Sequence, residues 1–254
     1  MRTDQWLKDS HENPVKLCKK LTRYFSNKAS EREIYQYLKM HGMYRSVSEN
    51  ILDSLPKNVW GKVEKEYSVL QKKWNGPQVP IFIFPADETN SRIKRDYNGK
   101  SGLAFKDKLF LFFSPHNSHD EIKAVLTHEY NHVCRLKKFK KNEADLTFLD
   151  TVILEGIAEN AVREHCGAEN VAGWTKYYSN ERLEQLVKQL IIPNQSVKKN
   201  ERKHNDLLYG KGFSPKMAGY CAGYYVVKQY LEDRKLQTNA ILGVDSMEFV
   251  KEYL

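Results

Sequence analysis

The chain has 254 residues, enough to bury a sizeable core, and its 41% hydrophobic and 29% charged residues are ordinary for a globular protein. Its 12% aromatic residues argue against a disordered chain, and no run reaches the roughly 18 apolar residues that a membrane helix needs. The net charge of +9 is spread along the sequence without an RNA-recognition strand, a zinc finger or a glycine-rich phosphate loop, which argues against nucleic acid as a partner.

The amino terminus and the cysteines indicate a cytoplasmic protein. Residues 1–11 are polar and charged with no apolar stretch behind them, so we expect no secretory signal. The four cysteines lie far apart and form no C-x-x-C pair, which predicts reduced, mostly buried thiols rather than disulfides or a cysteine zinc site.

The first 75 residues predict helices. Residues 15–24, 31–40 and 47–55 carry apolar side chains at three- and four-residue spacing. The run Asn75-Gly76-Pro77 then breaks the chain. We therefore expect an N-terminal helical region at residues 1–75, followed by a second domain at residues 76–254.

The next segment predicts a small sheet. Residues 79–84 (VPIFIF) have the β-branched and aromatic bias of a buried strand. A polar stretch with a turn signal at Asn98-Gly99 follows, and residues 102–113 predict two strands that meet at residues 106–108.

From Ser118 onward the pattern is helical. Ser118 and Glu121 form a capping box that opens a helix running to about Phe139. The further helices are expected at residues 143–165, 174–191 and 214–232, with a short last one capped by Asp245. Helices, a small sheet and more helices predict an α+β fold that is mainly helical.

Two histidines in the capped helix have the spacing of metal ligands. In the run HEYNH, His128 and His132 stand four residues apart, so both imidazoles project from one helix face and can share one tetrahedral zinc. Glu129 is close to the metal but angled away from the ligand direction, where it can accept a proton from water. Taken alone, the pair also fits two capped or core histidines.

The downstream helix supplies the third ligand. Glu155 follows His132 by 23 residues and lies in an apolar stretch, where an unpaired carboxylate is costly to bury and a divalent cation removes that cost. Gly156 is expected to let the two helices approach closely. Glu159, one turn later, is expected to accept the N–H of a metal-bound histidine. The alternative for both carboxylates is the exposed face of an amphipathic helix.

The HEYNH helix, the EGIAEN helix and the later residues 219–224 (GYCAGY) resemble the YjaZ-like family of predicted bacterial zinc-dependent proteases, and more broadly the gluzincin metallopeptidases. The resemblance covers roughly residues 79–232. It implies one zinc ion, the ligands His128, His132 and Glu155, and Glu129 as the catalytic base. It also implies a small, mostly antiparallel sheet on the active-site helix (residues 76–142), a helical lower half (residues 143–254) and a cleft between them.

Two further features are candidates for substrate chemistry. Tyr220 and Tyr224 share one helix face beside a glycine notch, and either could stabilise the oxyanion of peptide hydrolysis, with Tyr224 preferred; helix packing explains them equally well. His204, in a polar segment expected to be mobile, is a weaker candidate. Residues 102–105 are a candidate edge strand for binding substrate backbone.

These features predict a zinc-dependent peptidase acting on a peptide or protein substrate through a metal-activated water. One alternative is a catalytically silent zinc-binding regulatory protein. Another is a basic binder of nucleic acid or acidic partners with a structural zinc, although we interpret the basic runs at residues 135–141 and 198–204 as solvated helix ends and loops. Glu129 argues against both, because a structural zinc has no use for a carboxylate base beside it.

Overall fold

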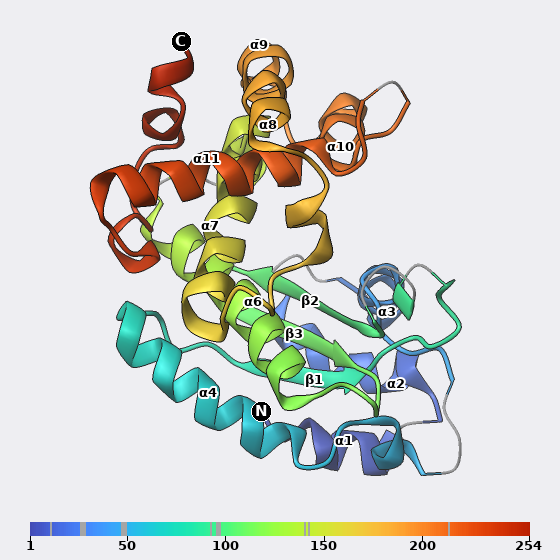
Figure 1. Cartoon of the computed structure of the whole chain (residues 1–254). Helices are drawn as coiled ribbons and strands as arrows, with labels where there is room; N and C mark the ends of the chain where they lie inside the picture. The colour runs from blue at the N-terminus through green and yellow to red at the C-terminus, as the bar shows by residue number, and fades with distance from the viewer. Residues whose placement is uncertain are drawn as a thin grey trace. The chain divides into compact units, whose positions relative to one another are not determined.

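The computed structural model describes residues 1–10, 12–25, 29–46, 50–91, 93–94, 98–139, 141, 143–212 and 214–254 (Figure 1). Its internal contacts divide the chain into two compact units, Met1–Val133 and Cys134–Leu254. The division falls inside helix α6 (His119–Lys138), which therefore begins in the first unit and ends in the second. The boundary expected at residue 75 stays a prediction. Within the described ranges, no helix combines the length and apolar character that crossing a bilayer requires.

The first unit opens with the predicted helices. They are α1 (Thr3–Ser10), α2 (Pro14–Cys18), the 3-10 turn η1 (Lys19–Tyr24), α3 (Glu31–Met40), η2 (Ile51–Ser54) and α4 (Val59–Trp74). The prediction for residues 31–40 is confirmed by α3. A capping box formed by Ser30 and Glu33 explains why the helix begins there. Of the helix expected at residues 47–55, residues 47–49 lie outside the described residues and the remainder holds only η2.

Three strands form the sheet of the first unit: β1 (Ile81–Pro85), β2 (Lys100–Phe105) and β3 (Lys108–Phe113). Figure 1 shows β3 between the other two; it pairs parallel to β1 and antiparallel to β2, so the sheet is mixed. The predicted hairpin at residues 102–113 is confirmed. The predicted turn is also confirmed, because Asn98 and Gly99 both adopt positive φ. Strand β2 lies at an edge of this sheet.

The second unit is helical. After the end of α6 it contains η3 (Glu143–Asp145), α7 (Phe148–Cys166), η4 (Gly173–Lys176), α8 (Asn180–Leu186), the π-turn η5 (Val187–Ile191), α9 (Ile192–Asn194), α10 (Arg202–Tyr209), α11 (Ala218–Arg234), η6 (Thr238–Ala240), η7 (Ser246–Phe249) and η8 (Lys251–Tyr253). Together with the sheet, these helices confirm the mainly helical α+β fold.

Side-chain caps move several of the predicted boundaries. The continuous helix expected at residues 174–191 is wrong: Ser179 accepts the N–H of Arg182 and starts a new helix, which separates α8 from η4. Helix α7 begins later than expected, after a capping box formed by Thr147 and Asp150. Helix α10 was not expected, because its segment is polar in sequence.

The basic run at residues 135–141 is not wholly solvated, contrary to our interpretation. Arg135 is 1% exposed and donates hydrogen bonds to the carbonyls of Ile241, Leu242 and Val244 at 3.3, 3.2 and 2.6 Å. Its guanidinium group also lies over the ring of Phe139, 4.1 Å from the ring centroid. Arg135 therefore ties the C-terminal segment to the end of α6.

Two glycines mark the crossing of α7 and α11. A Cβ atom on Gly156 would lie against the backbone carbonyl of Gly223, 2.6 Å from its carbon atom. A Cβ atom on Gly223 would lie against the carbonyl of Val152, 3.0 Å from its carbon atom. All three atoms closest to a Cβ on Gly156 belong to α11, so the two glycines set the spacing of α7 and α11. The expectation that Gly156 lets the histidine helix approach α7 stays a prediction.

Candidate metal centre

Helix α6 presents both histidines from one face. The ring centroids of His128 and His132 lie 4.6 Å apart with the ring planes at 86°. His132 is 7% exposed and His128 is half-buried. The predicted capping box is confirmed: the Ser118 hydroxyl accepts the N–H of Glu121 (3.1 Å), and the Glu121 carboxylate accepts the N–H of Ser118 (2.9 Å).

Tyr130 anchors the opposite face of α6. It follows His128 by two residues, about 200° around the helix, so the two side chains diverge. Tyr130 is fully buried, donates its hydroxyl to the carbonyl of Pro77 (2.9 Å) and packs against Tyr67 and Trp74. This anchor fixes the rotation of α6 and so the direction in which its histidines point.

Glu121 connects the start of α6 to the start of β2. Its carboxylate accepts hydrogen bonds from the Lys100 ammonium (2.6 Å) and the Asn98 amide (2.7 Å). Burial alone would raise the pKa of Glu121, but these bonds and the one from the Ser118 N–H outweigh it and lower the pKa to about 2. The ionised carboxylate is thus the form that the fold stabilises.

This connection predicts acid sensitivity. The pKa of Glu121 falls from 4.5 to about 2 on folding, so the stabilisation is complete above pH 4.5 and is lost as the pH falls toward 2. We expect Glu121→Gln to lower the free energy of unfolding by about 2–3 kcal/mol at pH 7 and to flatten its dependence on pH in that window. Urea unfolding from pH 7 to 2 measures the free energy of unfolding and its dependence on pH.

The control is Glu184→Gln, which removes the exposed partner of Lys188. It should change the free energy of unfolding by less than about 0.5 kcal/mol. Equal pH profiles for wild type and Glu121→Gln would contradict the assignment.

Glu129 lies beside His128 and against the edge strand. The three atoms closest to a Cβ built on Gly102 all belong to the Glu129 side chain. The carboxylate therefore lies over the backbone of β2, on the same helix as the two histidines. A carboxylate so placed can act as a general base without being a metal ligand.

Glu155 lies on α7, half-buried among buried apolar side chains. His128, His132 and Glu155 are a group of described residues that could hold a metal ion, with one ligand atom of each within 4.8 Å of the others. Two imidazole nitrogens and one carboxylate oxygen are a donor set that suits catalytic zinc and leaves a fourth position for water or substrate. The residues present therefore fit a zinc ion.

The other predicted site residues have structural partners. The Glu159 carboxylate is 4% exposed and accepts the backbone N–H of Ala172 at 2.5 Å. Its expected bond from a metal-bound histidine stays a prediction. The expectation that His204 is mobile is wrong: it is 1% exposed on α10, with its Nε2 2.9 Å from the Thr151 hydroxyl, and burial lowers its pKa. That hydrogen bond gives His204 a role inside the second unit.

Tyr220 and Tyr224 both contact Trp174, with ring centroids 5.3 and 6.3 Å from it. The Tyr220 hydroxyl donates to the hydroxyl of Tyr209 (3.5 Å), and burial raises the pKa of Tyr224. These contacts favour helix packing as the role of both tyrosines. An oxyanion role for either tyrosine stays a prediction.

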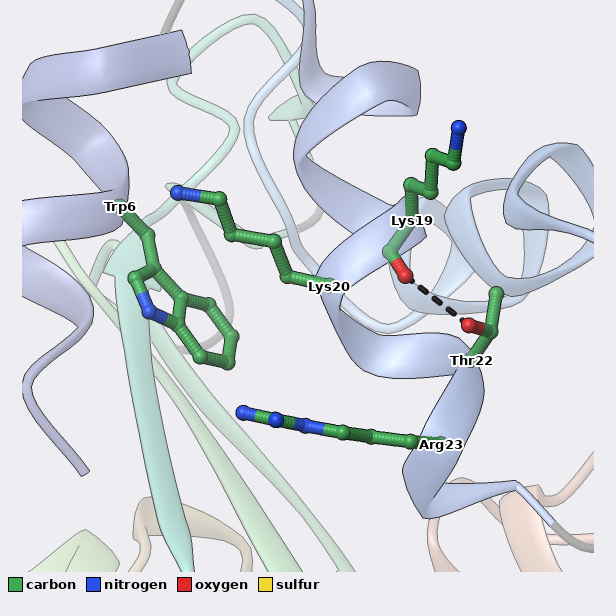
Figure 2. A pocket seen from close by; sticks show the side chains of 5 residues that line it. All are labelled: Trp6, Lys19, Lys20, Thr22 and Arg23. Atoms are coloured by element: carbon green, nitrogen blue, oxygen red, sulfur yellow. Dashed lines mark hydrogen bonds between the residues drawn. The ribbon is translucent and has the colours of Figure 1, made fainter.

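The first unit also has a basic hollow of about 340 Å³ that the sequence did not predict. It is lined by Trp6, Lys19, Lys20, Thr22 and Arg23. Figure 2 shows Lys20 and Arg23 extending toward Trp6, while the Lys19 side chain points away. The Thr22 hydroxyl donates to the Lys19 carbonyl (2.9 Å), and Lys20 pairs with Asp9 (3.2 Å). The lining has neither a histidine nor a carboxylate, and in this it differs from the group formed by His128, His132 and Glu155.

The amino-acid sequence matches one protein family over most of its length. The family model described as "Predicted Zn-dependent protease (DUF2268)" matches residues 59–251, a range that includes both histidines, Glu129 and Glu155. The chain belongs to this family. Its description supports a zinc-dependent protease, in agreement with the resemblance seen in the sequence.

Two relatives from Bacillus subtilis (strain 168) extend the comparison. The uncharacterized protein YjaZ is 41% identical over 232 residues, covering 90% of this chain and 89% of its own. The uncharacterized protein YjfC is 21% identical over 194 residues, covering 72% of this chain and 63% of its own. No solved structure matches the chain at a significant level. Family membership therefore rests on sequence similarity along nearly the whole chain.

Proposed function

We propose that the protein is a gluzincin-type zinc peptidase in which His128, His132 and Glu155 hold one zinc ion and Glu129 is the general base. The observation that carries the proposal is the group of two imidazoles and one carboxylate with ligand atoms within 4.8 Å of one another. The family description supports the choice of zinc and of proteolysis.

The chemistry divides between the ion and the chain. A zinc ion would supply Lewis acidity and make water acidic enough to lose a proton near neutral pH. Glu129 takes a proton from the attacking water as the water oxygen bonds to the peptide carbonyl carbon, and it delivers that proton to the amine nitrogen as the C–N bond breaks. The same carboxylate thus acts first as a base and then as an acid. Tyr224 or Tyr220 is proposed to donate to the developing oxyanion.

The proposed substrate is an extended peptide or an unfolded protein segment. Strand β2 is an edge strand of the sheet, and Glu129 lies against it at Gly102. A peptide that pairs with this edge would lie beside the carboxylate. Backbone pairing is largely independent of side chains, so we expect broad acceptance of unfolded chains.

The test is metal analysis combined with peptide hydrolysis. We expect about one zinc per chain, hydrolysis of an unfolded protein or peptide library, loss of activity on chelation and its return with added zinc. Zinc without hydrolysis of any substrate would favour the silent zinc-binding alternative. A protein that holds no zinc, even on titration, would remove the metal site altogether.

A further inference from the structure

Gly102 on β2 has no room for a side chain, and the group that fills the space is Glu129. A Cβ atom at this position would lie 2.6 Å from Glu129 Cδ and 2.7 Å from Oε1, and closer still to Cγ. Separations below 3.0 Å essentially never occur for real Cβ atoms, so something would have to shift.

The backbone gives no other reason for glycine here. Gly102 is not among the described glycines with positive φ, which are Gly42, Gly99, Gly167, Gly210 and Gly212. A glycine inside a strand weakens the strand and often marks a place where another group approaches closely. The close approach of Glu129 is therefore the feature that calls for glycine.

The strand and the helix are both held in place around this contact. Lys100 on β2 is bonded to Glu121 on α6 (2.6 Å), and the Ser101 hydroxyl donates to the carbonyl of His41 (2.8 Å). Tyr130, next to Glu129, is fixed by its bond to Pro77 (2.9 Å). With both backbones fixed, a side chain at position 102 would displace the Glu129 carboxylate rather than move the strand.

We propose that Gly102 is a positioning residue: the bare backbone of β2 sets the side-chain conformation in which Glu129 can take a proton. This inference rests on the proposed function for its effect on turnover but not for its geometry. Substrate pairing would use the backbone groups of β2, which Gly102→Ala keeps. A side chain at position 102 therefore acts through Glu129, and its effect must disappear when the Glu129 side chain is removed.

The test is the variant Gly102→Ala. We expect kcat to fall at least 10-fold with KM and zinc content unchanged, since a displacement of about 1 Å at a reacting group can cost 100-fold. In a Glu129→Ala background, Gly102→Ala should leave the residual turnover unchanged. Gly173→Ala is the matched control, because a Cβ at Gly173 meets nothing within 4 Å; it should keep wild-type kcat.

A crystal structure of Gly102→Ala without metal tests the geometry independently of activity. We expect the Glu129 carboxylate to move by more than 1 Å while β2 stays in place. An unmoved carboxylate, or wild-type kcat in Gly102→Ala, would overturn the inference. An inactive wild-type protein would instead overturn the proposed function, and the position of the Glu129 carboxylate in the crystal structure would then test the role of Gly102.

A double variant covers the case in which Gly102→Ala is too unstable to purify. Gly102→Ala/Glu129→Ala is expected to fold like Glu129→Ala, and its failure to do so would also overturn the inference.

Discussion

Replacing Glu129 with glutamine is expected to lower kcat for peptide hydrolysis about 1,000-fold while the zinc content stays at the wild-type level. Glutamine keeps the size of the side chain that packs against Gly102, so the contact with β2 is preserved. It removes the proton acceptor, and general acid–base catalysis contributes roughly 100- to 10,000-fold. Zinc content and the kcat of a quenched fluorescent peptide are the two measurements.

Two further variants separate the base from the ligands. His132→Ala is expected to lose both zinc and activity, because it removes one of three proposed donors. Glu184→Gln makes the same chemical change as Glu129→Gln at an exposed ion pair on α8, and it should leave kcat and zinc unchanged. Hydrolysis by Glu129→Gln at the wild-type rate would exclude Glu129 as the base. Loss of zinc in this variant would instead indicate that Glu129 is a ligand.

The features that the sequence predicts correctly depend on residues close together in the chain. The capping box at Ser118 needs only the four residues up to Glu121, and the turn at Asn98-Gly99 needs only two. The spacing of His128 and His132 places both on one helix face by helical geometry alone. Short-range chemistry therefore predicted the hairpin, the start of α6 and the histidine pair.

The features that the sequence does not predict depend on contacts between distant parts of the chain. Arg135 lies in a run of basic residues that suggests solvent, yet its hydrogen-bond acceptors lie more than 100 residues later. His204 lies in a polar segment, yet its ring nitrogen bonds to Thr151 on α7. The contact of Gly102 with Glu129 also joins two different elements, β2 and α6. These roles arise from tertiary packing, which periodicity and caps do not encode.

Gly156→Ala gives the sharpest test of the packing around the proposed ligand Glu155. Helix propensity alone predicts that alanine in the middle of α7 stabilises the protein by about 1 kcal/mol. The structure predicts the opposite. The added methyl group would lie against the backbone carbonyl group of Gly223, and it would also lie 2.9 Å from Cγ2 of Val227. Backbone atoms cannot rotate aside, so α7 and α11 must separate. We expect the free energy of unfolding to fall by about 3 kcal/mol, as measured in urea.

The same variant also reports on the metal. Glu155 precedes Gly156 on α7, so a shift of α7 away from α11 moves the proposed carboxylate ligand as well. We therefore expect weaker zinc binding together with the loss of stability, whereas Gly173→Ala, at an open position, should change neither by more than a few tenths of a kcal/mol. A Gly156→Ala protein that is more stable than wild type would show that the crossing of α7 and α11 accommodates a methyl group. Lower stability with unchanged zinc affinity would instead show that the spacing of α7 and α11 does not determine the position of the Glu155 carboxylate.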